Sequence, residues 1–203
     1  MPEIYGWSED NLSLTTQRDR EMTPAATFDL FDRNSGYFTS TGAVTNGSIF
    51  FSIFVPRSSL TFTTMTIACA NGGTDVGGTT RRAMGLFTVS GRSYTCVART
   101  ASDATIGNTA NTLYARTLDT SGGFPSSYTI NAGSTYAIGF FAYNTGGTYN
   151  GPSIVCGNSN QSIVSTLSPR TNDAITSQTD LPALNGSVTG TTNTPLRIWM
   201  RLS

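Results

Sequence analysis

The stretch that decides the fold is Tyr128 to Tyr143, YTINAGSTYAIGFFAY. Two apolar, β-prone runs flank residues 131–134, where a glycine can take the positive φ that a tight reversal needs. In the second run, 136–143, apolar residues occupy both alternating sets of positions, so neither face of a strand would be polar. Such a strand belongs at the centre of a sheet that is covered on both faces. The stretch therefore predicts a hairpin whose second strand is a central strand of a β-sandwich.

The rest of the chain repeats this pattern of short apolar runs between Gly and Pro turns. An Asn46-Gly47 turn signal indicates another hairpin and opens onto a near-continuous apolar run that ends at Pro56. This run predicts a second central strand. The clearest hairpin signal spans 83–99, with a Ser-Gly-Arg turn in its middle.

Two strands carry more specific predictions. Between residues 60 and 69 the apolar side chains change from even to odd positions, so we predict a β-bulge or a kink near Thr63 and Thr64. The final run, 196–202, alternates cleanly and predicts one strand with four apolar residues facing the core. The residues expected to face away from the core are Arg197, Trp199 and Arg201. They predict either a subunit interface or a local stack of Arg on Trp.

No helical periodicity extends beyond about two turns, whereas around ten short strands follow one another at near-regular spacing. The sequence therefore predicts an all-β fold, a two-sheet antiparallel β-sandwich of the jelly-roll type closed by its first and last strands. We expect a single domain over residues 28–203, preceded by an N-terminal arm of residues 1–27.

Composition excludes much chemistry. The chain has no His and no Lys, its twelve cations are all Arg, and its formal net charge is zero. Imidazole and Lys-based catalysis are therefore excluded, and no basic face is available for nucleic acid. The few Asp residues of the body read as turn residues. We predict no enzyme activity, no catalytic residues, no cofactor, no metal site and no nucleic-acid partner.

The abundance of Ser, Thr, Asn and Gly is typical of extracellular β proteins, yet we predict no signal peptide and no membrane insertion. Three cysteines, Cys69, Cys96 and Cys156, make a poor disulfide framework and predict buried reduced thiols rather than reactive or metal-bound ones. A protein that is made in a reducing host cytoplasm and works outside the cell reconciles these observations. A virion component released by lysis is one such protein.

Two regions are candidate binding sites. The N-terminal arm, 1–27, is either a solvated lead-in or an anchoring segment that orders on a neighbouring subunit through Tyr5 and Trp7. The Gly-rich loop after the central strand is either a plain turn or a sugar site. Sugar sites stack a ring on an aromatic side chain and bind hydroxyls through polar side chains. The candidate glycan-binding residues there are Tyr143, Asn144, Tyr149 and Asn150.

Several framework segments resemble a known family. They are MGLFTVSG (84–91), CVARTASD (96–103), LDTSGGFP (118–125), INAGSTYAIG (130–139) and DLPAL (180–184). Together they resemble the jelly-roll domains of minor tail, fibre and related virion proteins of tailed bacteriophages, most closely those of actinobacterial hosts. The resemblance covers roughly residues 27–203, rests on structural turns and brings no catalytic residues.

The resemblance implies a non-enzymatic virion protein that is tail-associated, contacts other virion subunits and forms a homotrimer. It also implies a contribution to binding of host cell-surface polysaccharide. The alternative is a capsid decoration protein that stabilises the phage head by burying surface against the shell. Members of the family often carry collagen-like or coiled-coil stalks, which this sequence lacks.

Overall fold

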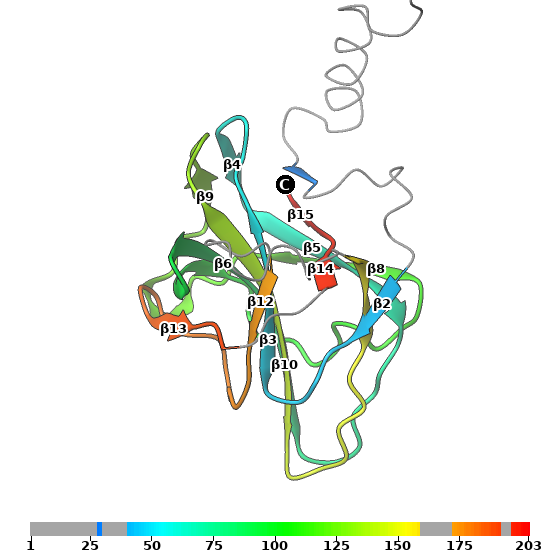
Figure 1. Cartoon of the computed structure of the whole chain (residues 1–203). Helices are drawn as coiled ribbons and strands as arrows, with labels where there is room; N and C mark the ends of the chain where they lie inside the picture. Colours follow the sequence, from blue (N-terminus) through cyan, green and yellow to red (C-terminus); the bar gives the residue numbers. More distant parts are fainter. Residues whose placement is uncertain (1–27, 30–39, 159–171, 192–195) are drawn as a thin grey trace, which may run out of the picture.

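A computed structural model describes residues 28–29, 40–158, 172–191 and 196–203 of the chain. In these residues the regular structure is β-strand, apart from the single 3-10 turn η1 (Ser121–Gly123). The strands form two large antiparallel sheets and a short two-stranded sheet (Figure 1). The predicted all-β sandwich of the jelly-roll type is confirmed. The predicted arm, 1–27, lies outside the described residues.

Sheet A contains seven strands. They are β1 (Phe28–Asp29), β2 (Ser40–Ala43), β5 (Thr64–Asn71), β8 (Thr112–Thr117), β11 (Ser153–Asn158), β14 (Leu196–Ile198) and β15 (Met200–Leu202). β5 pairs with β8, β11 and β15, while β2 and β14 pair with β11. Phe28 lies opposite Leu202, so the first and last strands close the sandwich as predicted.

Sheet B contains six strands. In spatial order they are β12 (Asn172–Ile175), β3 (Ser48–Phe54), β10 (Tyr136–Thr145), β6 (Thr79–Ser90), β7 (Ser93–Arg99) and β13 (Ser187–Thr189). At the centre, Gly139 of β10 lies between Phe51 of β3 and Gly85 of β6. Residues 136–142 are all buried, which confirms the predicted central strand.

The predicted pairing of the two strands in the deciding stretch is wrong. The first strand exists as β9 (Tyr128–Ile130), but it pairs with β4 (Leu60–Phe62) in the two-stranded sheet. β10 cannot accept it, because β3 and β6 already occupy both of its edges. With both edges occupied, β10 has none left for the segment that immediately precedes it.

The hairpin predicted at Asn46 and Gly47 is wrong for a related reason. β2 on one side of the turn pairs with β11 in sheet A, whereas β3 on the other side belongs to sheet B. The turn therefore carries the chain from one sheet to the other, and the Gly47 amide donates to the Ala142 carbonyl of β10 at 2.9 Å. The hairpin predicted over 83–99 is confirmed as β6 and β7.

The predicted β-bulge is confirmed where β4 ends and β5 begins. The backbone amides of Thr63 and Thr64 both donate to the Ser203 carbonyl, at 2.9 and 2.8 Å. Two successive amides that share one acceptor mark the extra residue of a bulge. The bulge lets Phe62 and Met65 both face the interior, so the change of apolar positions in the sequence is accommodated.

The predicted strand 196–202 is interrupted. β14 pairs with β11 and β15 pairs with β5, and the Trp199 amide between them donates to the Val155 carbonyl at 3.0 Å. Trp199 is only 3% exposed, so the expectation of an outward, exposed Trp is wrong. The change of partner at Trp199 breaks the regular alternation from which that expectation came.

Two apolar cores lie on opposite faces of sheet B. The larger core fills the space between the sheets and includes Met84, Ile138 and Phe140 from sheet B, with Ile67 and Met200 from sheet A. The smaller core lies on the outer face of sheet B. Its buried residues are Ile49, Phe51, Ile53, Ala83, Phe87, Tyr94, Cys96, Phe124, Ala137, Phe141 and Leu181. Phe124 and Leu181 come from segments outside the sheet and cover this face.

All three cysteines are buried and none forms a disulfide, as predicted. Burial raises the pKa of Cys96 to about 12, although the nearby Arg99 opposes this shift. Burial likewise raises the pKa of Cys69, against the opposing charge of Arg82. A thiol with a raised pKa carries little thiolate at neutral pH and is therefore a poor nucleophile.

Candidate functional site

Two glycine-rich loops meet at one end of the sandwich. One joins β5 to β6 and the other joins β10 to β11, and both reach the lower end of the molecule in Figure 1. They pair through Val76 and Thr148, whose amides donate to each other's carbonyls at 3.0 and 2.8 Å. We call residues 74–79 and 145–150 the paired tip.

A buried ion pair lies directly beneath the paired tip. Arg82 Nη2 is 3.1 Å from Asp75 Oδ2, and the two side chains are 0% and 1% exposed. The sequence places Arg82 here because it follows the alternation of β6 and shares an inward face with Met84 and Leu86. An inward Arg needs an acidic partner, and Asp75 supplies it from the loop.

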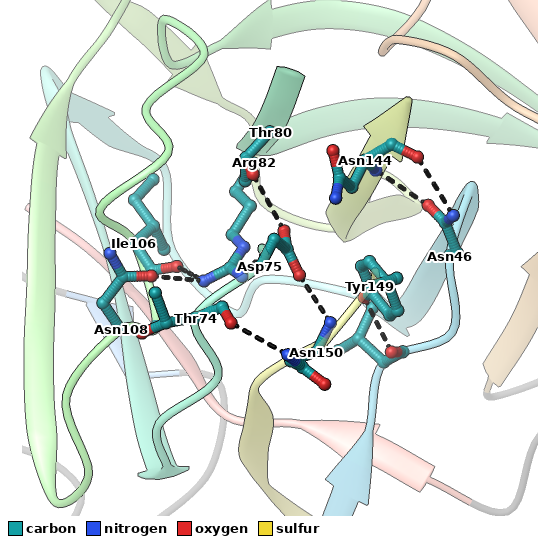
Figure 2. A network of polar contacts seen from close by, with 12 residues as sticks. Asn46, Thr74, Asp75, Thr80, Arg82, Ile106, Asn108, Asn144, Tyr149 and Asn150 are labelled. Carbon is teal, nitrogen blue, oxygen red and sulfur yellow. Dashed lines mark hydrogen bonds and ion pairs between the residues drawn. The ribbon is translucent and has the colours of Figure 1, made fainter. Parts of the chain in front are cut away.

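Arg82 also reaches a third segment, the connection between β7 and β8. Its Nη1 donates to the Ile106 carbonyl and to Asn108 Oδ1, both at 2.8 Å (Figure 2). Gly107, between these two, has a φ of +81° and packs against Pro152, where a Cβ would meet the proline ring. One guanidinium therefore joins the loop between β5 and β6 to the connection between β7 and β8.

Asp75 and Thr74 hold the second loop of the tip through Asn150. The Asn150 amide donates to Asp75 Oδ1 at 2.6 Å, and Asn150 Nδ2 donates to the Thr74 carbonyl at 3.0 Å (Figure 2). The Asp75 carboxylate thus binds Arg82 through one oxygen and the neighbouring loop through the other. This arrangement fixes the position of one loop relative to the other.

Asn144 is a second organising residue of the tip and is 3% exposed. The Asn46 side chain forms two hydrogen bonds with its backbone. It accepts one from the Asn144 amide at 2.8 Å and donates one to the Asn144 carbonyl at 3.1 Å. Its side-chain Nδ2 donates to the carbonyls of Gly77 and Thr148 at 3.1 and 3.4 Å. Asn144 therefore connects the end of β10 to both loops.

Tyr149 packs inward from the tip. Its hydroxyl donates to the Val44 carbonyl at 2.7 Å, and its ring packs against the larger core. Burial raises the pKa of Tyr149, although Arg82 opposes this shift. The hydroxyl therefore remains protonated and keeps its hydrogen bond throughout the physiological range.

The candidate glycan-binding residues are divided by the structure. Asn144, Tyr149 and Asn150 come together at the tip, and each makes hydrogen bonds within the chain. Tyr143 lies on the opposite face of sheet B, where it packs against the smaller core and stacks near Phe141 at 6.4 Å between ring centroids. The polar side chains proposed for sugar binding thus hold the loops in place, and the predicted glycan contact stays a prediction.

The outer surface of the paired tip is uncharged, because its one carboxylate is buried. Val76 is 64% exposed and is the largest apolar side chain on this surface. The exposed residues are Thr74, Val76, Gly77, Gly78, Thr79, Thr145, Gly146, Gly147, Thr148 and Asn150. The tip is therefore a rigid neutral surface of backbone amides, threonine hydroxyls and one branched aliphatic side chain.

Among the described residues, those predicted to form an interface do not come together in a site like the paired tip. Tyr5 and Trp7 lie outside the described residues. Trp199 is buried within the chain and Arg201 is half-buried, so neither is a fully exposed anchor. The interface role of Arg197, Trp199 and Arg201 stays a prediction.

Sequence reasoning missed Asp75 and Arg82, the pair on which the tip depends. The sequence predicts Asp75 only as one of the turn aspartates of the body. The signal that could have found the pair is the position of Arg82, which continues the inward set of an otherwise apolar strand.

Comparison with known proteins adds no relative. No protein-family model matches the chain, and no curated protein matches it either. Among the described residues, no three Cys, Asp or Glu side chains lie close enough together to hold a metal ion. No helix within the same residues has the length and apolar character needed to cross a membrane.

Proposed function

We propose that the chain is a non-enzymatic structural protein of a tailed-phage virion. In this proposal it is a tail-associated subunit, a homotrimer in its assembled form, whose paired tip contributes to binding of host-surface glycan. The resemblance of its framework segments to phage jelly-roll domains supports the virion assignment. The ion pairs that the described aspartates form with arginines support the non-enzymatic assignment.

Each aspartate whose side chain the structure describes forms an ion pair with Arg, with a nitrogen to oxygen distance of 4.0 Å or less. The pairs are Asp75 with Arg82, Asp103 with Arg116, Asp119 with Arg99, Asp173 with Arg92, and Asp180 with Arg81 and Arg99. Cleavage of a glycosidic bond needs two carboxyl groups that face one cleft and are free to donate and accept protons. Carboxylates committed to guanidinium groups favour a structural role.

The paired tip supports the binding part of the proposal. Binding residues are often carried by loops that a rigid scaffold positions, and loops that are already ordered lose less entropy on binding. The buried pair of Asp75 and Arg82 provides this order, and the neutral outer surface suits an uncharged polymer better than an anionic one.

A fusion of the chain to a fluorescent protein tests the binding role. It should stain actinobacterial cells, and soluble cell-wall polysaccharide should compete the stain away. Val76→Asp should reduce staining at least tenfold, because it places a charge on the neutral tip. Leu113→Asp is the matched control, since Leu113 is similarly exposed at 51% but lies on β8. Absence of staining at micromolar concentration would contradict the binding role.

Antibody labelling of intact particles that contain this subunit tests its place in the virion. Gold at the tail is the expected result, and gold distributed over the head would replace the tail assignment with the decoration alternative. Sedimentation of the purified chain tests the homotrimer. A monomer at all accessible concentrations would remove that part of the proposal.

A further inference from the structure

One short segment supplies both outermost strands of sheet B. Residues 172–191, which we call the strap, contain β12 at one edge of the sheet and β13 at the other. β12 pairs with β3, and β13 pairs with β7. The strap therefore connects the two edges of the sheet and covers edges of β3 and β7 that would otherwise be free.

The two ends of the strap bind each other. The Thr191 amide donates to the Ala174 carbonyl at 2.9 Å, and the Thr191 hydroxyl donates to the same carbonyl at 3.3 Å. Gly190 lies against the Asp173 carboxylate so closely that a Cβ at Gly190 would overlap it. The strap is therefore closed at its ends by contacts within itself.

The underside of the strap is apolar. Leu181 is 4% exposed and belongs to the smaller core, and Ile175, Leu184 and Val188 pack against that core. The sheet face beneath presents Phe51, Phe87 and Phe141 among its largest side chains. Without the strap, this face would be an extended apolar patch bordered by two open strand edges.

The ion pairs that hold the strap to the sheet share one arrangement of charges. The sheet provides the guanidinium groups, and the strap provides the carboxylates. Arg92 Nη2 lies 3.3 Å from Asp173 Oδ1, and the Tyr94 hydroxyl donates to Asp173 Oδ2 at 3.2 Å. Arg81 and Arg99 approach Asp180 at 3.8 and 4.0 Å. The anchors at Asp180 are half-exposed and bind weakly.

We propose that the strap opens as one unit while the rest of sheet B stays folded, and that it prevents the sheet from associating with a second copy of the chain. The closed ends make the strap a unit of its own, and the ladders that hold it to β3 and β7 have only four and three residue pairs, against ten between β10 and β6. The edges of β3 and β7 and the apolar face between them form the surface that a second copy would use, by pairing edge to edge.

Amide hydrogen exchange followed by NMR tests the opening. The strap amides, and the β3 amides that bond to β12, should exchange at least tenfold faster than the β10 amides. Equal rates on both sides of β3 would overturn the proposal, because the strap would then open only when the whole sheet unfolds.

Gly190→Ala tests the consequence of opening. The added Cβ overlaps the Asp173 carboxylate and should part the ends of the strap, so strap exchange should accelerate and sedimentation should detect concentration-dependent association. Gly146→Ala is the control, because a Cβ there meets no atom within 4 Å, although its φ is +75°. Asp180→Asn is a milder second variant that removes only the half-exposed anchor, and a shift of about twofold in the same direction is expected. A variant with an open strap that associates no further than the parent protein would overturn the proposed guarding role.

Discussion

The guanidinium of Arg82 is fully buried and has exchanged its hydration for three acceptors, on Asp75, Ile106 and Asn108. A buried pair of this kind adds little net stability compared with apolar residues that fill the same space, because desolvation offsets the attraction. Removal of one partner is different, since the remaining charge is left inside the protein without compensation. The value of the pair therefore lies in the position it imposes on three loops.

Asp75→Ala should destabilise the protein by about 3–5 kcal/mol, because Arg82 would keep its charge in a buried site. Urea denaturation followed by circular dichroism measures the change. Asp180→Ala is the matched control, since Asp180 is half-exposed and its removal should cost less than about 1 kcal/mol. Equal losses in the two variants would show that burial does not distinguish these pairs.

Asp119 predicts a specific dependence of stability on pH. Hydrogen bonds from the hydroxyl and amide of Ser121, together with Arg99, lower the pKa of Asp119 below its usual 3.8, although partial burial opposes them. A carboxyl group whose pKa is lower in the folded state stabilises the fold fully above the unfolded value and loses this effect as the pH falls through the folded value.

Asp119→Asn should therefore be less stable than the parent protein at pH 5, and the difference should narrow as the pH falls below 3.8. Thermal unfolding between pH 5 and pH 2.5 measures this change. A difference that stays constant over that range would contradict the assigned shift.

At the scale of elements, β10 depends on two glycines that face each other across strands. Gly139 lies opposite Gly85, and a Cβ at either position would meet the Phe87 ring at 2.9 Å. The Phe87 side chain can lie across the sheet only because both positions lack a side chain. In the smaller core, the space that the Phe87 ring occupies is therefore bounded by the backbone of these two glycines.

Gly139→Ala should cost about 1–3 kcal/mol, because the new methyl group overpacks a filled core. In a Phe87→Leu background the same change should cost less, since the smaller side chain leaves room. A double-mutant cycle from chemical denaturation measures this coupling. Additive losses would mean that Phe87 is not the obstacle.

Local patterns predicted the strands of this protein well and their partners poorly. The double-sided burial of β10 and the bulge before Thr64 could be predicted, because both follow from side-chain alternation along a single segment. The partner of β9 could not, because it depends on which edges distant strands have already occupied. The interruption at Trp199 has the same origin, since it marks a change of partner and not a change of composition.

The candidate site shows the same division between local and distant information. The sequence identified the loop that contains Asn144, Tyr149 and Asn150, and these residues do meet at the tip. Their inward hydrogen bonds could not be predicted, because the acceptors lie on loops that are distant in the sequence. Asp75 differs, because its partner Arg82 lies only seven residues later. The other contacts of this pair, with Ile106, Asn108 and Asn150, come from distant segments and could not be predicted.

At the scale of the whole molecule, the thiols of Cys69, Cys96 and Cys156 are all buried and form no disulfide, with Cys69 in the larger core and Cys96 in the smaller one. The folded protein should therefore react with Ellman's reagent only slowly, and unfolding in urea should release three reactive thiols for each chain. Stability should be unchanged by added reductant. Rapid labelling of the folded protein would show that one core opens readily.

The central position of β10 also has a consequence for biosynthesis. Both of its neighbours precede it, and Gly139 follows its partner Phe51 by roughly 90 residues, which corresponds to about 5–20 s of translation. During this interval β3 and β6 are apolar strands with unoccupied edges, which is the state in which nascent chains aggregate. The soluble yield of this protein should therefore depend more on the chaperone capacity of the expressing cell than on the stability of the finished fold.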